Sequence, residues 1–134
     1  MDTIKVTFPG GKRVDARYKD FLIKTDQPVY AGGDGTAPAP FDLFLSSIAT
    51  CAGYYVLAFC QNRGIPVDKA SVLMRTHKNE EKKRIDRISL EIQLPPGFPE
   101  KYTKAVIKSV DSCSVKVHMI DTPDFEISVN KSET

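Results

Sequence analysis

Single-residue alternation of apolar and polar side chains marks the first part of the chain. The segments Ile4–Phe8 and Arg13–Tyr18 both show this period of two, and Pro9–Gly11 ends the first of them. A short apolar segment, Phe21–Lys24, follows. Alternation between turn residues is typical of half-buried strands. The pattern therefore predicts three strands in an antiparallel meander.

The spacing becomes helical after a loop over residues 26–39 that is rich in glycine and proline. Pro40 suits a first helical turn because its missing N–H would have no partner there, and Gly64 and Pro66 end the helix near Arg63. One face is apolar at helical spacing: Phe41, Phe44, Leu45, Ile48, Ala52, Tyr55 and Phe59. Further apolar residues continue around most of the circumference. Since such a helix needs burial on nearly every side, it is predicted to lie centrally, at a subunit interface.

The second half of the chain predicts two strands, a helix, a short helical segment and a last strand. The two strands are Val67–Arg75 and Ile85–Leu94, and the charged run Lys78–Arg84 between them is interpreted as a solvated hairpin end. A helix opens at Pro99, the short helical segment follows residue 113, and Phe125–Val129 closes as a strand. Because the strands come in groups, the fold class is α+β with a mostly antiparallel sheet, in one domain over residues 1–134.

Composition and charge narrow the classes of partner that the protein could bind. Hydrophobic residues at 41% and charged residues at 27% are ordinary globular values, and 19 basic residues are balanced by 17 acidic ones. This mixed charge argues against nucleic acid or an anionic membrane as a partner. The chain does not begin like a signal peptide, and its longest apolar run, Cys51–Cys60, has about half of the ~20 residues that cross a bilayer. A soluble, cytoplasmic protein is expected.

The three cysteines differ in what they can do. Cys51 and Cys60 lie on opposite faces of the predicted helix, about 13.5 Å apart along its axis, so they cannot form a disulfide. Cys60 is interpreted as a core residue. Cys51 and Cys113 lie on different elements that the fold could bring together. Cys113 follows a plausible N-cap, Ser112, and a first helical turn favours a thiolate. A redox pair and two buried structural thiols both remain open.

Other chemical groups give weaker indications. His77 and His118 are the only histidines, and neither belongs to a zinc motif, so no metal and no cofactor are expected. A Cys–His acyl-transfer site with Cys51 and His118 is conceivable, but a surface or packing role suits His118 better. The run Gly32–Gly35 is followed by no Lys-Ser/Thr pair and is interpreted as a turn that leads into the helix.

Two stretches of the chain resemble the OsmC/Ohr family. The glycine turn, proline and helix of Gly32–Cys51 resemble the family's first cysteine segment, and Asp111–Val115 resembles the second. The order of the elements matches as well, so the resemblance covers nearly the whole chain. It implies an OsmC-like α+β fold in which antiparallel sheets pack around long central helices of an intertwined homodimer, with two sites at the subunit interface.

The resemblance also implies an activity and its residues. Members of the family are thiol peroxidases for organic hydroperoxides, a defence against oxidative stress. Carried over by motif, Cys51 is the peroxidatic thiolate that becomes a sulfenic acid, and Cys113 is the resolving thiol that condenses with it to a disulfide. A dithiol reductant then resets the pair. The expected walls of the substrate pocket are Phe41, Phe44, Tyr54 and Tyr55.

The chain departs from the peroxidase branches of the family at two points. Those branches carry a glutamate where this chain has Phe41, and an arginine that holds the thiolate. Residues 26–31, before the glycine turn, contain no arginine, which leaves Arg13 and Arg17 of the second strand as candidates. The chain is more similar to a less characterised OsmC-like subgroup. The alternative function is therefore a non-catalytic protein that binds a small apolar or thiol-reactive ligand at the dimer interface.

Overall fold

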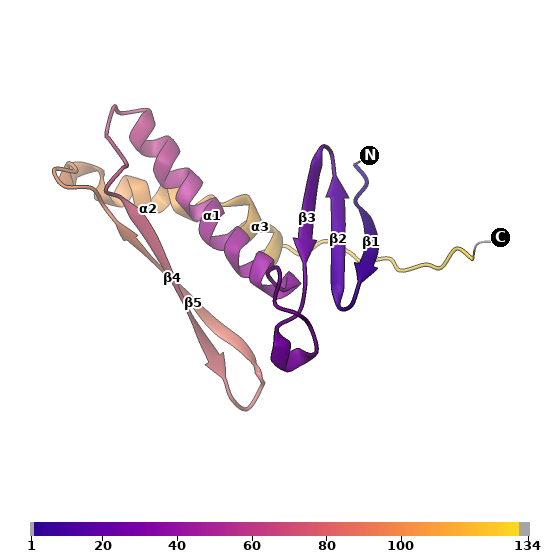
Figure 1. Ribbon diagram of the computed structural model, residues 1–134. Coiled ribbons are helices and arrows are strands. Elements are labelled where there is room, and N and C mark those ends of the chain that lie inside the picture. Colours follow the sequence, from indigo (N-terminus) through magenta and orange to yellow (C-terminus); the bar gives the residue numbers. More distant parts are fainter. Residues whose placement is uncertain (1, 132–134) are drawn as a thin grey trace. The chain divides into compact units, whose positions relative to one another are not determined.

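A computed structural model describes residues 2–131 of the chain (Figure 1). The chain forms two compact units, residues 1–47 and residues 48–134. The fold is α+β with antiparallel sheets, as the grouping of the strands predicted. Helix α1 (Pro40–Gln61) begins in the first unit and continues into the second.

The first unit contains a three-stranded antiparallel sheet, which confirms the predicted meander. Its strands are β1 (Lys5–Gly10), β2 (Arg13–Tyr18) and β3 (Phe21–Thr25), in the order β1-β2-β3. The two faces differ because the side chains alternate. Thr7, Asp15 and Lys24 lie abreast on the polar face, whereas the apolar Val6, Ala16 and Ile23 lie abreast on the other.

A buried carboxylate organises the loop between this sheet and α1. Asp26 is fully buried, and it accepts hydrogen bonds from the hydroxyl of Thr36 (2.6 Å), the N–H of Thr36 (3.0 Å) and the N–H of Gln27 (2.7 Å). The same loop needs glycine at position 33, where a Cβ atom would lie 2.0 Å from the carbonyl oxygen of Gln27. The glycine-proline segment is therefore an ordered turn, held by the Asp26 hydrogen bonds, that leads into the helix.

The second unit packs α1 against a hairpin and two shorter helices. Its other elements are β4 (Ser71–Asn79), β5 (Arg84–Gln93), the 3-10 turn η2 (Glu100–Tyr102), α2 (Thr103–Asp111) and α3 (Ser114–Ile120). The strands β4 and β5 pair antiparallel, with the charged turn between them at the hairpin end as predicted. The core consists of Ala52, Val56, Phe59 and Cys60 of α1 with Val106 and Val110 of α2.

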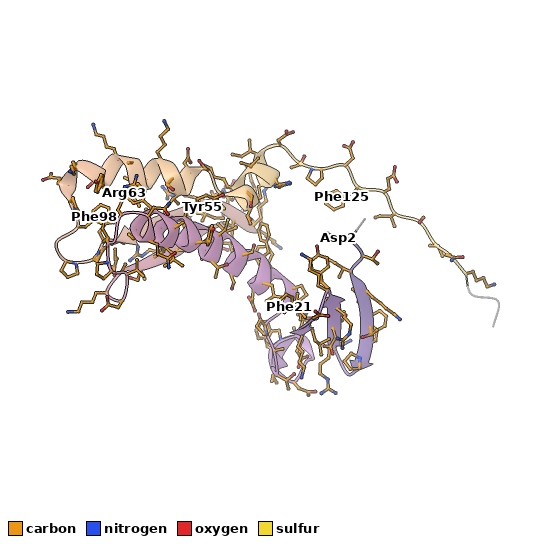
Figure 2. The ribbon with its side chains drawn as sticks, turned by 90° about the horizontal axis from the view of Figure 1, so that it is seen from above. Asp2, Phe21, Tyr55, Arg63, Phe98 and Phe125 are labelled. Atoms are coloured by element: carbon orange, nitrogen blue, oxygen red, sulfur yellow. The ribbon has the colours of Figure 1, made fainter. Side chains whose placement is uncertain are left out.

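The end of α1 is held by aromatic packing and a cation. The ring of Phe59 lies 6.2 Å from that of Phe98 and 5.8 Å from that of Tyr102. The guanidinium of Arg63 stacks 3.6 Å from the Phe59 ring and donates a hydrogen bond of 3.1 Å to the Phe59 carbonyl. Figure 2 shows Arg63 and Phe98 at the same end of the second unit. This arrangement caps the negative end of the helix dipole.

Several predicted boundaries were wrong. Strand β4 begins at Ser71 rather than Val67, because Val67 accepts a hydrogen bond from Ala70 in a turn. Helix α1 ends at Gln61, two residues early. The helix expected at Pro99 starts as the 3-10 turn η2. Residues 122–131 form no strand, because no neighbouring strand pairs with them.

Within the described residues, α1 is long enough and apolar enough to cross a membrane, as judged by length and composition alone. The mean hydropathy of its most apolar window is 1.7. Core helices of soluble proteins pass the same criterion. In the described chain 28% of this apolar window is buried. The buried part includes Ala52, Val56, Phe59 and Cys60, which belong to the core of the second unit.

The Asp26 cluster predicts an acid-sensitive loop. Hydrogen bonds from Thr36 and Gln27 lower the pKa of Asp26 from 3.8 to about 2. Because the pKa is lower in the folded state, the stability that the carboxylate contributes is present above pH 3.8 and is lost as the pH falls through about 2. Asp26→Asn should be less stable than the wild type at pH 6, and this difference should shrink as the pH falls toward 2. Urea denaturation at several pH values measures it. The exposed Asp20→Asn is the control, and equal behaviour of the two variants would contradict the assignment.

Candidate active site

Both predicted redox cysteines lie in the second unit, and the fold brings them together. Cys51 is half-buried on α1, and Cys113 is 3% exposed in the link between α2 and α3. Backbone bonds fix the link, since the N–H of Cys113 donates to Val110 (3.1 Å) and its carbonyl accepts from Val117 (3.0 Å). Cys113 itself is the N-cap of α3, which corrects the expected cap at Ser112. Cys60 is fully buried elsewhere in the core, as predicted.

The two thiols affect each other in opposite directions. Burial alone would raise the pKa of Cys51, but a hydrogen bond from the Cys113 thiol helps to bring the pKa below its ordinary value. Burial raises the pKa of Cys113, and its hydrogen bond to Cys51 raises it further. Of the two thiols, Cys51 is therefore the one that loses its proton more readily, and Cys113 the one that holds its proton more tightly.

The first turn of α3 supplies the other groups that favour the Cys51 thiolate. The N–H of Val115 and both the hydroxyl and the N–H of Ser114 donate hydrogen bonds that lower the pKa of Cys51. No arginine is among these main contributors, as far as the structure describes the chain. Among the described residues, hydrogen-bond donors are therefore the groups that lower the pKa of Cys51 most.

The other predicted charged and polar groups are not among the main groups that shift the pKa of Cys51. Arg13 and Arg17 are exposed on β2 in the first unit, and Arg13 donates a hydrogen bond of 3.2 Å to the Gly10 carbonyl. His118 is exposed on α3, where its Nδ1 lies 2.6 Å from the Ser114 carbonyl oxygen. It is not among the main groups that shift the pKa of Cys51, so the acyl-transfer alternative gains no support.

No group of three or more His, Cys, Asp or Glu side chains within residues 2–131 could hold a metal ion.

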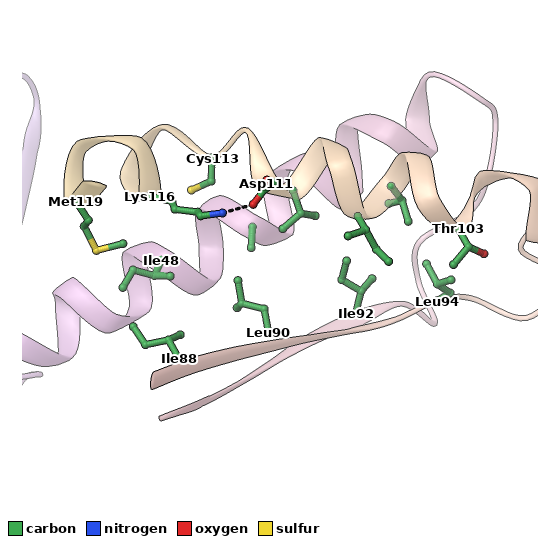
Figure 3. A pocket seen from close by; sticks show the side chains of 14 residues that line it. Ile48, Ile88, Leu90, Ile92, Leu94, Thr103, Asp111, Cys113, Lys116 and Met119 are labelled. Atoms are coloured by element: carbon green, nitrogen blue, oxygen red, sulfur yellow. Dashed lines mark hydrogen bonds and ion pairs between the residues drawn. The ribbon is translucent and has the colours of Figure 1, made fainter. Parts of the chain in front are cut away.

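An apolar cavity of about 490 Å³ opens beside Cys113 (Figure 3). Its floor is the inner face of β5, its roof is α2 and the start of α3, and Ile48 and Ala52 of α1 line one side. The strand contributes Ile88, Leu90 and Ile92. The polar groups on its wall include the ion pair of Lys116 with Asp111. A cavity of this size and lining suits a small apolar ligand held near a thiol.

The four aromatic residues predicted as pocket walls do not line this cavity. Phe41 and Phe44 are 56% and 40% exposed in the first unit, with their ring centroids 5.5 Å apart. Tyr54 is 62% exposed, and its ring meets that of Tyr55 edge to face at 5.6 Å. Tyr55 packs against the core. Their contact with a substrate stays a prediction.

Sequence reasoning missed Ser114, the cavity walls on β5 and α2, and the pair Lys116–Asp111. The alternating residues of β5 and the apolar stripe of α2 were visible in the sequence as core-facing positions. Nothing in the sequence showed that they would leave a space between them next to Cys113. Ser114 follows Cys113 directly in the sequence. Its hydroxyl becomes a candidate hydrogen-bond donor to a thiolate only because helix α3 begins at this residue.

Comparison with known proteins identifies relatives. The family model of the OsmC-like proteins matches residues 33–128. A Psychrobacter arcticus structure assigned to the osmotic stress and detoxification response is 25% identical, with a TM-score of 0.71 over 86% of this chain and 85% of that one. An OsmC-like protein of Mycoplasma pneumoniae is 16% identical, with a TM-score of 0.69 over 91% and 89%.

A further structure, the organic hydroperoxide resistance protein OsmC of Legionella pneumophila, is 17% identical, with a TM-score of 0.57 over 89% and 88%. No curated protein matches the chain at a significant level.

The role of Ser114 is testable on the thiol itself. Ser114→Ala removes one donor to the Cys51 thiolate, so the pKa of Cys51 should rise and its alkylation by iodoacetamide at pH 7 should slow several-fold. Peptide mass spectrometry across a pH series measures the rate at Cys51 alone. Ser112→Ala is the matched control, since the Ser112 hydroxyl lies 3.5 Å from the Lys108 carbonyl instead. An unchanged pH profile in Ser114→Ala would contradict the assignment.

Proposed function

Since this chain belongs to the OsmC-like protein family, we propose that it is a thiol-dependent peroxidase that reduces organic hydroperoxides. The observation that carries the proposal is the pairing of Cys51 and Cys113, which lowers the pKa of one thiol and raises that of the other. The similarity to a structure named an organic hydroperoxide resistance protein supports the same role in the response to hydroperoxide stress.

The first step consumes the thiolate. The Cys51 sulfur attacks the distal oxygen of the hydroperoxide, an S–O bond forms, the O–O bond breaks, and the alcohol leaves as its alkoxide. In this proposal the Cys113 thiol, whose pKa is raised by burial and by the bond to Cys51, protonates the alkoxide. The products of this step are an alcohol, a sulfenic acid at Cys51 and a thiolate at Cys113.

The second step closes the disulfide. The Cys113 thiolate attacks the Cys51 sulfur, the S–S bond forms, and hydroxide leaves. Two electrons have then passed from the thiol pair to the peroxide. A dithiol reductant of the cytoplasm restores both thiols by exchange.

The site holds its thiolate differently from the arginine-dependent arrangement that the resemblance suggested. Ser114 and the N–H groups of Ser114 and Val115 take the position of the missing cation. Phe41 likewise carries no charge where the peroxidase branches have a glutamate. Because neutral donors stabilise a charge less than a cation does, we expect a slower enzyme than an arginine-assisted one.

A second candidate function is binding without turnover, which the apolar cavity beside Cys113 favours. In this case a small apolar or thiol-reactive molecule occupies the cavity, and the thiols hold it rather than reduce it. Inactivity with several hydroperoxides, together with a ligand that raises the melting temperature, would favour this function over the peroxidase.

We further propose that the protein acts as a homodimer, because large apolar side chains remain exposed in both units. In the first unit Phe8, Phe21 and Tyr30 are 80%, 66% and 94% exposed. In the second, Tyr54 of α1 and Ile120 of α3 are 62% and 75% exposed. Apolar surface on this scale is typical of an interface with another chain.

Three cysteine variants test the mechanism with cumene hydroperoxide as substrate and dihydrolipoamide as reductant. Cys51→Ser should lose activity to the background of the buffer. Cys113→Ser should reduce one equivalent of peroxide and then stall with a sulfenic acid that dimedone traps at Cys51. Cys60→Ala is the control and should turn over like the wild type. Full activity of Cys51→Ser would exclude the mechanism.

The dimer is tested by light scattering on the column-purified protein. We expect a mass about twice the 14.9 kDa of one chain. A mass of 14.9 kDa across micromolar concentrations would contradict it.

A further inference from the structure

Two features of the second unit adjoin each other: a pair of thiols in contact, and an apolar cavity that one of them lines. The side chains of Cys51 and Cys113 share a hydrogen bond, and Cys113 is also part of the cavity wall. Figure 3 shows the Cys113 side chain across the cavity from Leu90 of β5. A molecule that enters the cavity can therefore react with thiols at its edge.

Helix α1 brings the second thiol to the same edge. Ile48 and Ala52 line the cavity, and Cys51 lies between them in the sequence, three residues after the first. Residues three apart on a helix are neighbours on its surface, so Cys51 lies beside Ile48. Cys51 is half-buried and Cys113 is buried. An atom bonded to both sulfurs would lie at the edge of the cavity and would meet Cys51 first.

The thiol pair is a donor set of two. No third His, Cys, Asp or Glu joins it in a group that could hold a metal ion, as far as residues 2–131 are concerned. The remaining cysteine, Cys60, is fully buried in the core. A zinc ion, which takes four ligands in structural sites, would lack partners here. The pair suits an element that needs two sulfurs only.

Trivalent arsenic with one organic substituent is such an element. It is thiophilic, and two of its three valences are free for the soft sulfur ligands that a cysteine pair supplies. The third valence carries the organic group, for which the cavity of about 490 Å³ provides apolar surroundings. An electrophile with a single reactive atom position would need Cys51 alone and would leave Cys113 unused.

We propose that the reduced pair of Cys51 and Cys113 binds monosubstituted trivalent arsenicals, R–As(OH)₂, as a cyclic dithioarsenite whose apolar group R occupies the cavity. The inference rests on the contact between the thiols that the proposed function also uses. It names a chemical class for the thiol-reactive ligand of the second candidate function, and it requires no turnover of peroxide.

The binding reaction is a condensation without oxidation. Two As–O bonds break and two As–S bonds form, while arsenic stays trivalent and the sulfurs are not oxidised. The two thiol protons leave with the two hydroxides as two water molecules. Cys51, whose pKa is lowered, attacks first, since the thiolate is the nucleophile. Cys113 then closes the ring within the same molecule, which makes two thiols bind far more tightly than one.

The cavity wall selects the organic group. Leu90 and Ile92 of β5 and Val106 of α2 are among its apolar residues. The two charged residues of the wall, Lys116 and Asp111, form an ion pair with each other. Burial of apolar surface in such a cavity is favourable. An arsenical with a phenyl group should therefore bind more tightly than one with a methyl group.

Titration of the intact reduced protein with phenylarsonous acid tests the two-thiol site. A phosphine keeps the thiols reduced, because a dithiol would compete. We expect one equivalent to bind, and the intact mass to gain one phenylarsenic group in place of two hydrogen atoms. Cys51→Ser and Cys113→Ser should each weaken binding at least ~100-fold, since each leaves one thiol. Cys60→Ala is the control and should bind like the wild type.

Comparison with methylarsonous acid tests the cavity. The wild type should bind the phenyl compound at least ~10-fold more tightly than the methyl compound. Leu90→Trp fills the cavity and should abolish this preference while the methyl compound still binds. Leu73→Trp is the matched control: Leu73 lies on β4 and does not line the cavity, so the preference should remain.

Two results would overturn the inference. One is phenylarsonous acid that binds the wild type no more tightly than Cys113→Ser. The other is a wild type that binds the phenyl and methyl compounds equally, a result that does not depend on whether Leu90→Trp folds. Either result in a protein that forms the Cys51–Cys113 disulfide with peroxide would reject this inference alone. Tight two-thiol binding without peroxide reduction would reject the peroxidase and support this inference.

Discussion

The hydrogen bond from the Cys113 thiol to the Cys51 sulfur is the interaction on which the proposed chemistry depends. It lowers the pKa of the half-buried thiol and raises that of the buried one, which is why we propose that one pair supplies both the nucleophile and the proton donor. The rest of the second unit maintains this bond. The α1 core fixes Cys51 at one side, and the link from α2 to α3 presents Cys113 and Ser114 from the other. A shift of either element would separate the thiols.

Stabilisation of the thiolate by neutral donors fits the departures from the peroxidase branches of the family. Phe41 stands at the glutamate position, and the two candidate arginines of the second strand lie in the other unit. In the proposed mechanism, Ser114 and two N–H groups of the first turn of α3 take the role of a cation, since they lower the pKa of Cys51. The apolar cavity next to Cys113 is of a size and lining that would admit the organic part of the proposed hydroperoxide substrate.

Much of this fold could be predicted from the sequence, because its patterns are local. Alternation indicated the meander, and the apolar helix and its stop at Gly64 and Pro66 were visible. The resemblance to the OsmC/Ohr family singled out Cys51 and Cys113. The cavity and the role of Ser114 could not be predicted, because they arise where α1, α3 and β5 meet. The strand expected at Phe125–Val129 failed in the single chain for the same reason, since a strand requires a neighbour.

Oxidation of the reduced protein with one equivalent of an organic hydroperoxide tests the central claim most directly. We expect rapid loss of two hydrogen atoms from the intact mass, and a single cross-linked peptide pair that joins Cys51 to Cys113 while Cys60 stays free. A protein that leaves the peroxide unreduced, or that forms its disulfide through Cys60, would contradict the account.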